Sequence, residues 1–225
     1  MYSSDLKQKA RYDLAGKWGI AILAALIAGI LGALLIASSV TFNLHLDERN
    51  LNFLTEKVVK FLSRLLTGAG FLGLVQFILG GTVQLGYSIF LLKMHDGQDA
   101  SLDDLFSQFH RFGTGFCQAF LRGLYVFLWS LLFIIPGFIA IFKYAMTPFI
   151  LAENPDMTAS EGITASKYLM DGYKWNLFCL HLSFIGWVLL NILTLGIGSL
   201  WLNPYMNASY AAFYRTVCIR KQHNA

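Results

Sequence analysis

The sequence predicts an all-α membrane protein with about six transmembrane helices in three hairpins, together with amphipathic helices at the membrane interface. Three observations predict this class. Hydrophobic residues make up 56% and charged residues 13% of the 225 positions, and the mean hydropathy is +0.55, beyond the usual range of soluble domains. Apolar runs long enough to cross a bilayer follow one another closely. The stretch 116–152 contains no Asp or Glu. We therefore treat residues 1–225 as one integral membrane domain.

The first predicted span covers residues 18–40, and four basic residues precede it. These are Lys7, Lys9, Arg11 and Lys17. The apolar run is too long for the core of a signal peptide, and no clear small-x-small cleavage site ends it. We therefore expect it to be retained as a membrane helix.

The acid-free stretch 116–152 predicts a hairpin. As one straight helix it would be roughly 55 Å long, whereas a hydrocarbon core is roughly 30 Å thick. Pro136 lacks a backbone donor and Gly137 tolerates positive φ, so we expect the chain to bend at this pair. Whether the hairpin spans the membrane or is re-entrant stays open.

The remaining spans follow from the other apolar runs. The predicted spans after the first are 70–92, 115–135, 138–152, 175–193 and 199–218. Gly196 and Gly198 predict a tight turn between the last two. The final span is unusually polar and contains Pro204, which predicts a kinked helix able to line a cavity.

Basic residues fix the predicted orientation, because cytoplasmic loops are enriched in Lys and Arg. One side carries the four N-terminal cations together with Lys93, Arg111, Lys167, Lys174, Arg215, Arg220 and Lys221. The other side carries Arg49, Lys57, Lys60 and Arg64. Both termini are therefore expected in the cytoplasm, and the localisation is the cytoplasmic membrane. Since the cations flank apolar runs, topology explains the net charge of +4 and we expect no nucleic-acid partner.

The connections between spans contain helix signals. Ser101 can cap a helix with apolar residues on one face, and Thr158 with Glu161 has the form of a capping box. The helix after Thr158 should end at Gly172 and present a small face that packs on the spans. That face consists of Ala159, Gly162, Ile163, Ser166 and Met170. A further surface helix is expected around Leu51 to Leu65.

Chemistry within the spans is sparse. No carboxylate lies inside them, which disfavours proton- or sodium-coupled transport. No hydrolase, metal or Walker motif is present, so we expect no catalytic residue, no metal and no cofactor. Cys117, Cys179 and Cys218 are read as packing residues. An intramembrane enzyme would require convergence of scattered polar groups.

Two cations within the stretch 116–152 need partners. Arg122 and Glu153 lie at similar distances from Pro136, so we expect them to pair as a structural clamp, with snorkelling of Arg122 as the alternative. Lys143 has no partner in the sequence pattern and either snorkels or faces a wet cavity. If the two cations lack protein partners, they become candidate ligands for an anionic headgroup or substrate. Tyr144 and Tyr205 complete this candidate binding set.

Several segments of the sequence form a recognisable combination. They are Pro136-Gly137, 143–155, 166–172, 182–187, 194–198, 203–205, Ala10-Arg11 and Trp18. Together they resemble the domain of unknown function 975 family of bacterial integral membrane proteins. The similarity covers nearly the whole chain. It implies a multi-helix protein of the cytoplasmic membrane and brings no established reaction or catalytic residue.

Three functions are compatible with these features. A non-catalytic membrane scaffold or accessory subunit fits the tight hairpins and the missing chemistry. A binder or transporter of lipids, or of amphipathic or anionic small molecules, fits Arg122, Lys143 and the polar last span. An intramembrane enzyme would bring His181 together with Asn191 and Tyr205. Expected partners are membrane lipids and a membrane protein or a second copy of the chain.

Overall fold

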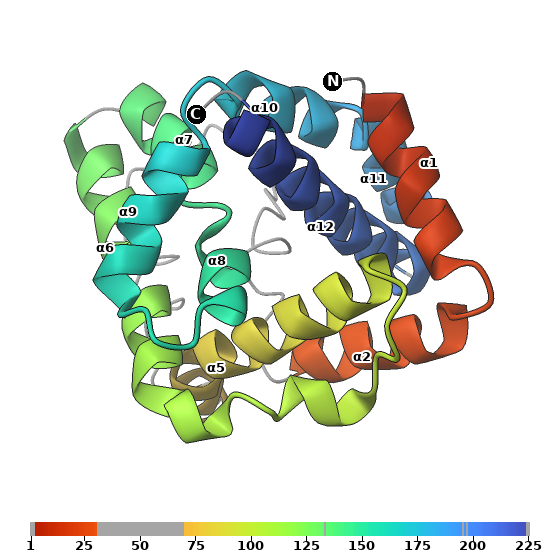
Figure 1. Ribbon diagram of the computed structural model, residues 1–225, viewed down its shortest axis with the longest axis horizontal. Coiled ribbons are helices and arrows are strands. Elements are labelled where there is room, and N and C mark those ends of the chain that lie inside the picture. Colours follow the sequence, from red (N-terminus) through yellow and green to blue (C-terminus); the bar gives the residue numbers. More distant parts are fainter. Residues whose placement is uncertain (1–2, 31–69, 133, 195, 197, 224–225) are drawn as a thin grey trace, which may run out of the picture.

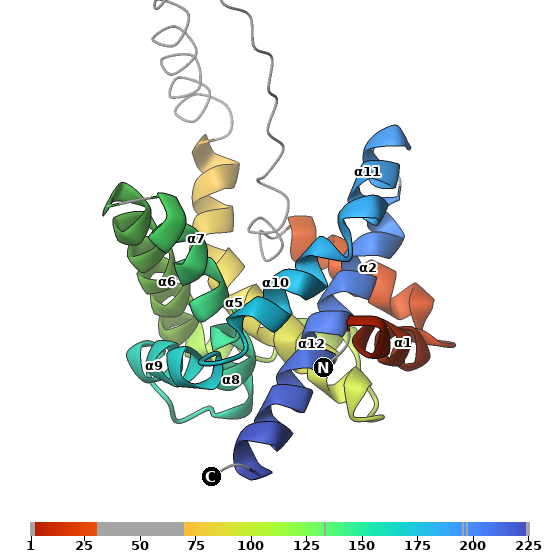
Figure 2. The same ribbon diagram turned by 90° about the horizontal axis from the view of Figure 1, so that it is seen from above.

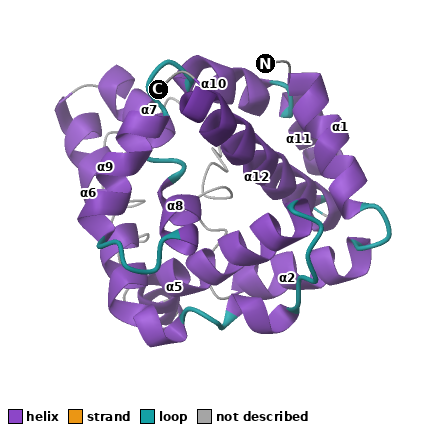
Figure 3. Ribbon diagram, in the orientation of Figure 1, coloured by secondary structure: helices purple, strands orange, loops and turns teal. Residues whose placement is uncertain are grey.

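The fold is all-helical throughout the part of the chain that the structure describes (Figure 1, Figure 3). The structure is a computed structural model that describes residues 3–30, 70–132, 134–194, 196 and 198–223. Its α-helices are α1 (Ser3–Leu14), α2 (Trp18–Ile30), α5 (Gly70–His95), α6 (Phe112–Leu132), α7 (Ile134–Lys143), α8 (Thr147–Glu153), α9 (Ala159–Leu169), α10 (Lys174–Leu182), α11 (Ile185–Leu193) and α12 (Ser199–His223). Two 3₁₀ helices, η1 (Leu102–Leu105) and η2 (Phe109–Arg111), connect α5 to α6. The predicted all-α class is confirmed.

Helix α5 joins the two halves of the molecule. It packs against α6, α8 and η1, and also against α2 and α12. In Figure 2, α6 and α7 stand on one side of α5, and α10, α11 and α12 stand on the other. Helix α1 lies against α12, while α9 contacts both α6 and α8. The N-terminal helix and the C-terminal helix are therefore neighbours.

Small residues bring the helices close together. A Cβ atom added at Gly81 of α5 would lie 2.1 Å from the carbonyl oxygen of Gly115 on α6, so the two backbones touch at this crossing. Helix α2 buries alanines against the core, and so does α12. The buried alanines are Ala21, Ala24, Ala25, Ala28, Ala208, Ala211 and Ala212. This close packing through small side chains is common between membrane helices.

The first tight hairpin turns before the predicted position. Helix α6 ends at Leu132 and α7 already begins at Ile134, so Pro136 and Gly137 lie inside the first turn of α7 and do not form the bend. A proline is tolerated there because the first-turn N–H groups have no helical partner. Gly137 serves packing instead, since a Cβ atom at this position would lie 2.1 Å from Ser130 Oγ on α6.

Two segments predicted as single spans are each divided into two helices. The segment 138–152 breaks between α7 and α8, where Pro148 cannot donate a helical hydrogen bond and restricts Thr147 before it. The segment 175–193 breaks between α10 and α11, where the Ser183 hydroxyl donates to the Leu180 carbonyl at 2.7 Å. The prediction of one continuous helix over each of these two ranges is therefore wrong.

The last predicted helix is continuous. Helix α12 continues through Pro204 without a break, and Pro204 is buried. Gly196 has φ of +87° and turns the chain between α11 and α12, as the glycine pattern predicts. Gly198 has no positive φ; its N–H donates to Thr194 Oγ1 at 3.3 Å. The glycine turn thus depends on Gly196.

The capping box before α9 is confirmed. Thr158 Oγ1 accepts from the Glu161 backbone N–H, and the Thr158 N–H donates to Glu161 Oε2 at 2.8 Å. The predicted small face of α9 is buried, and a Cβ atom at Gly162 would lie 2.6 Å from the Leu151 side chain. Gly172, with φ of +83°, follows the end of this helix.

The helix expected from Ser101 is shorter than predicted. It consists of the single turns η1 and η2, with Leu105 buried and Phe106 exposed. The surface helix predicted around Leu51 to Leu65 and the second half of the first span, 31–40, lie outside the described residues.

Among the described helices, none by itself has the length and hydropathy needed to cross a membrane. Helices α1 and α2 reach these limits only as a pair, and they meet at an angle of 103°.

Candidate functional site

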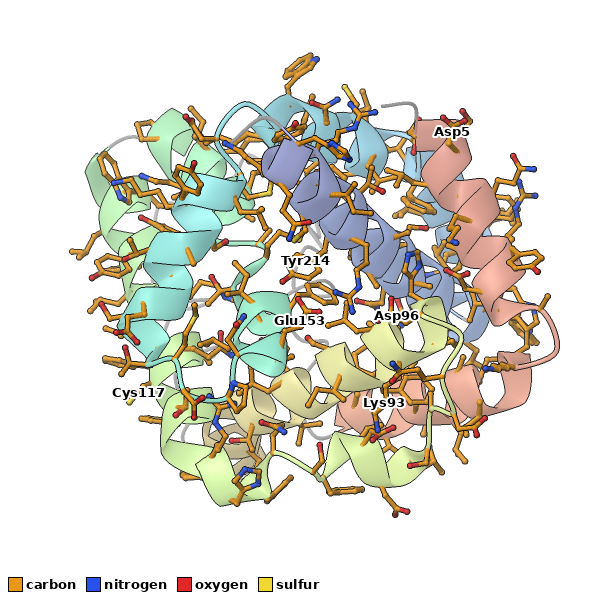
Figure 4. The ribbon with its side chains drawn as sticks, viewed as in Figure 1. Asp5, Lys93, Asp96, Cys117, Glu153 and Tyr214 are labelled. Atoms are coloured by element: carbon orange, nitrogen blue, oxygen red, sulfur yellow. The ribbon has the colours of Figure 1, made fainter. Side chains whose placement is uncertain are left out.

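A charged cluster joins the C-terminal ends of α5 and α8 to the C-terminal half of α12. Arg215 of α12 donates from Nε to Asp96 Oδ1 at 3.0 Å and pairs through its two terminal nitrogens with Asp96 and Glu153. Asp96 directly follows α5, and Glu153 is the last residue of α8. Figure 4 shows Asp96 and Glu153 close to Tyr214 between these helices. The cluster links three segments that lie far apart in the sequence.

Tyr214 extends this cluster into the core. Its hydroxyl donates to Glu153 Oε2 at 2.5 Å, and its ring stacks on Phe149 with centroids 5.6 Å apart. Tyr214 is buried, whereas the Glu153 side chain is about one-third exposed. Because every charge here has an opposite charge or a donor beside it, the cluster is suited to holding helices together rather than to attacking a substrate.

Further polar contacts lie near the C-terminal end of α5. His95 Nδ1 lies 2.6 Å from Asp13 Oδ2, which joins α5 to α1, and Lys93 Nζ forms an ion pair of 2.6 Å with Asp104 Oδ1 of η1. Arg111 donates to the carbonyl groups of Leu151 and Met157, and burial lowers the pKa of its guanidinium. The charge pattern assigns all of these connections to one side of the membrane, which stays a prediction.

Arg122 has a different partner from the predicted one. It is buried in the contact between α6 and α5, where its Nη2 donates to Gln84 Oε1 at 3.0 Å. The expected Arg122–Glu153 pair is wrong, because Glu153 binds Arg215 and Tyr214 instead. The prediction failed because it placed the bend at Pro136 and treated α7 and α8 as one straight helix.

Lys143 has aromatic neighbours. Its Nζ lies 5.7 Å from the centroid of the Trp129 ring and 5.5 Å from that of Tyr144. Tyr144 in turn packs against Tyr125 with ring centroids 5.8 Å apart. Cation–π attraction of this kind offsets part of the cost of removing an ammonium group from water. Arg122 and Lys143 therefore have separate partners and do not converge on one site with Tyr205.

A groove surrounds Tyr205. It has a volume of about 270 Å³ and is formed by α1, α2, α11 and the beginning of α12. Its lining residues are Arg11, Trp18, Trp187, Leu190, Asn191, Gly198, Trp201, Leu202 and Tyr205. Three tryptophans and a tyrosine thus meet a single cation, a lining typical of sites for apolar or amphipathic ligands. The sequence pattern identified Tyr205 but not the other walls.

Arg11 is exposed and has no ion-pair partner in the described part of the chain. Lys7, one turn earlier on α1, donates to the Ser183 carbonyl at 2.5 Å and lies 4.2 Å from the centroid of Phe184. Burial and the nearby Arg11 both lower the pKa of Lys7. The two cations make this rim of the groove positive.

The polar residues considered for catalysis divide between two places. His181 Nδ1 lies 3.3 Å from the Tyr210 hydroxyl, and the two rings stack with centroids 4.9 Å apart. Asn191 and Tyr205 line the groove instead, and their convergence with His181 in an enzyme site stays a prediction. Within the described residues, no group of three His, Cys, Asp or Glu side chains is arranged to hold a metal ion.

Sequence reasoning missed Asp96, Arg11 and the position of Arg215 beside Glu153. Arg215 was counted only as a topology signal, and Arg11 only as one of four N-terminal cations. Neither residue has a local motif, because each acquires its neighbours from helices distant in the sequence. The missing information was that α12 packs against both α1 and α5.

The comparisons with known proteins give a family and no activity. A family model described as a protein of unknown function (DUF975) matches residues 1–143 and 133–221. No curated protein and no solved structure matches the chain. Since the two matched ranges cover almost all of the sequence, the chain belongs to the DUF975 family of proteins of unknown function.

Proposed function

We propose that the protein is a non-catalytic scaffold or accessory subunit embedded in the cytoplasmic membrane. The observation that carries this proposal is an apolar belt on α6, α7 and α11, whose large side chains are exposed. The belt consists of Leu124, Phe127, Leu128, Phe138, Ile139, Ile141, Ile185, Leu189, Leu190 and Leu193. Leu193 is 81% exposed and Phe127 is 62% exposed, so water would meet a large apolar surface.

The polar end supports the same proposal. The polar contacts of His95 and Lys93 lie at the end of α5, and the ion pairs of Arg215 lie in the C-terminal half of α12. In Figure 2 the C-terminal end of α12 lies far from α7 and α11. Such a division between an apolar zone and a charged zone is what the boundary between lipid and water demands. In this proposal the six apolar runs enter the membrane, some as broken helices, and both termini lie in the cytoplasm.

Membrane extraction tests the location. We expect the full chain to stay in the membrane pellet after alkaline carbonate washing and to enter solution only with detergent. For orientation, a cysteine introduced as Glu48→Cys in a chain without its three native cysteines should react with an impermeant maleimide added outside intact cells. Release by carbonate contradicts the membrane location, and protection of position 48 contradicts the orientation.

Photo-crosslinking in native membranes tests the scaffold role. A photoreactive residue at Phe127 or Leu193 of the belt should form discrete adducts with another polypeptide. The same residue at Tyr12, which is 78% exposed on α1, is the control outside the belt. Adducts with lipid alone at both belt positions contradict a scaffold.

A second candidate function is the binding of an amphipathic molecule. The groove around Tyr205 favours it, because aromatic walls and a free Arg11 provide an apolar surface and a positive charge together. Arg122 and Lys143 do not contribute, since Arg122 bonds to Gln84 and Lys143 lies beside Trp129. This candidate predicts binding without chemical change of the ligand.

A further inference from the structure

We propose that the groove between α1, α2, α11 and α12 binds one anionic phospholipid, with an acyl chain along the aromatic walls and the phosphate at Arg11. This inference rests on the proposed membrane location and deepens the second candidate function by naming its ligand. The groove combines residues from four helices, so it exists only in the folded protein.

The groove extends along the first two turns of α12. Gly198, which directly precedes α12, and Tyr205 both line it, and seven positions correspond to roughly 10 Å along a helix. The Asn191 side chain marks the Gly198 end, because a Cβ atom on Gly198 would lie 3.1 Å from Asn191 Oδ1. The absence of a side chain at Gly198 keeps this end of α12 close to α11.

The walls between these ends are largely apolar. Trp187, Leu190 and Trp201 line the groove and are each more than half exposed. Their surfaces are therefore open to a ligand that enters from the side. An acyl chain laid against them would make van der Waals contacts with apolar side chains along its length.

The charge at the rim selects an anion. Arg11 lines the groove together with Tyr205 and has no carboxylate partner in the described part of the chain. Arginine binds phosphate oxygens through two parallel hydrogen bonds, so a phosphodiester is a well-matched partner. Lys7 adds a second positive charge on the same face of α1. A zwitterionic phospholipid also carries a phosphate, but its ammonium group would meet these two cations.

The position of Arg11 fits the headgroup level of the inner leaflet. It belongs to the amphipathic helix α1, which buries Leu6, Ala10 and Leu14 and exposes charged residues. In the proposed orientation α1 lies on the cytoplasmic surface, where anionic lipids attract basic residues. The chain of the bound lipid would then extend from α1 toward the α11–α12 turn.

Tryptophan fluorescence can report this ligand directly. Three of the five tryptophans line the groove, and a chain carrying Trp129→Phe and Trp175→Phe keeps only those three. We would reconstitute this full-length variant in phosphatidylcholine nanodiscs containing a small fraction of phosphatidylglycerol with brominated acyl chains, which quench tryptophan on contact. The comparison is the same fraction of brominated phosphatidylcholine.

We expect brominated phosphatidylglycerol to be enriched about fivefold at the groove, the effect of one cation at a membrane surface. Arg11→Gln should remove the difference between the two lipids. Lys9→Gln makes the same charge change on the exposed opposite face of α1 and should leave the difference intact. Equal quenching by both lipids overturns the proposal. So does an equal loss of the lipid difference in Arg11→Gln and Lys9→Gln. Unlabelled competitors test the headgroup, and the proposal also fails if added oleate reduces the quenching more than unlabelled phosphatidylglycerol does.

These outcomes separate the ligand from the location. If carbonate releases the native protein from membranes, the membrane proposal fails and the groove inference fails with it. If the protein stays in the membrane but shows no lipid difference, only the groove inference fails. Circular dichroism of Arg11→Gln in detergent checks that its helices are intact, and a folded variant that keeps the full lipid difference overturns the role of Arg11.

Discussion

The Tyr214 hydroxyl donates a hydrogen bond of 2.5 Å to Glu153, although the two residues are 61 positions apart. This contact joins the middle of α12 to the end of α8. It also orients the carboxylate that Arg215 binds from the next position of α12. The short helix α8 is thereby held between α5 and α12 at its C-terminal end.

Removal of the Tyr214 hydroxyl should weaken this connection. We expect Tyr214→Phe to lower the free energy of unfolding by about 1 kcal/mol, because the bond has a charged acceptor but that acceptor keeps Arg215 and some water. Unfolding of the purified protein in mixed micelles measures the change. Tyr12→Phe removes a hydroxyl from a residue that is 78% exposed and should have no effect. Equal stability of Tyr214→Phe and the native protein would contradict a structural role.

Arg122 should be energetically coupled to Gln84 and not to Glu153. In double-mutant cycles, Arg122→Met with Gln84→Leu should show a coupling energy of about 1 kcal/mol, because the two side chains share a hydrogen bond. Arg122→Met with Glu153→Gln should be additive within about 0.5 kcal/mol. The readout is unfolding in mixed micelles for each single and double variant. Coupling to Glu153 in place of Gln84 would restore the clamp expected from the sequence.

Two glycine substitutions should have opposite effects on stability. Gly81→Ala places a Cβ atom 2.1 Å from the Gly115 carbonyl oxygen, so α5 and α6 must separate and the protein should lose about 1–3 kcal/mol. Gly123→Ala on α6 meets no atom within 4 Å and should be neutral or gain up to about 1 kcal/mol from helix propensity. Thermal unfolding midpoints of the two variants in the same detergent give the comparison. A tolerated alanine at position 81 would show that the crossing is looser than described.

The capping box of α9 should weaken in acid. Hydrogen bonds from the Thr158 backbone and hydroxyl lower the pKa of Glu161 below its usual range. The stabilisation is therefore present above the ordinary glutamate pKa, about 4.3, and is lost as the pH falls through the lower folded value. As the pH falls through this range, the amides of residues 158–169 in the native protein should lose protection from hydrogen exchange, measured relative to the intrinsic exchange rate at each pH. Glu161→Gln should exchange faster at neutral pH and show a smaller acid response; an unchanged response would assign it to another group.

Much of the helical pattern was predictable because its causes are local. The capping box at Thr158, the small face of α9 and the left-handed glycines at positions 172 and 196 all depend on residues within one or two turns. The acid-free character of 116–152 also predicted that α6 and α7 pack side by side. These features required no knowledge of the rest of the chain.

The sequence-based predictions were wrong where a residue is compatible with two different local structures. Pro136 is compatible with a bend or with the first turn of a helix, and the packing of Gly137 against Ser130 favours the second. The break at Pro148 was overlooked because an apolar run was read as one helix. Both errors misplaced the residues after the bend relative to α6. Glu153 was therefore predicted beside Arg122, whereas Arg122 bonds to Gln84.

The amino-acid sequence by itself determined that the chain is helical, where several of its helices begin, and which family it resembles. Periodicity, capping residues and apolar runs act over a few residues, so they can be read directly. Only the tertiary structure decided which charges meet. Arg215 reaches Asp96 and Glu153, and Arg11 reaches the groove beside Tyr205, because α12 packs against α5 and α1. Those contacts depend on the summed packing of distant helices, which no single motif encodes.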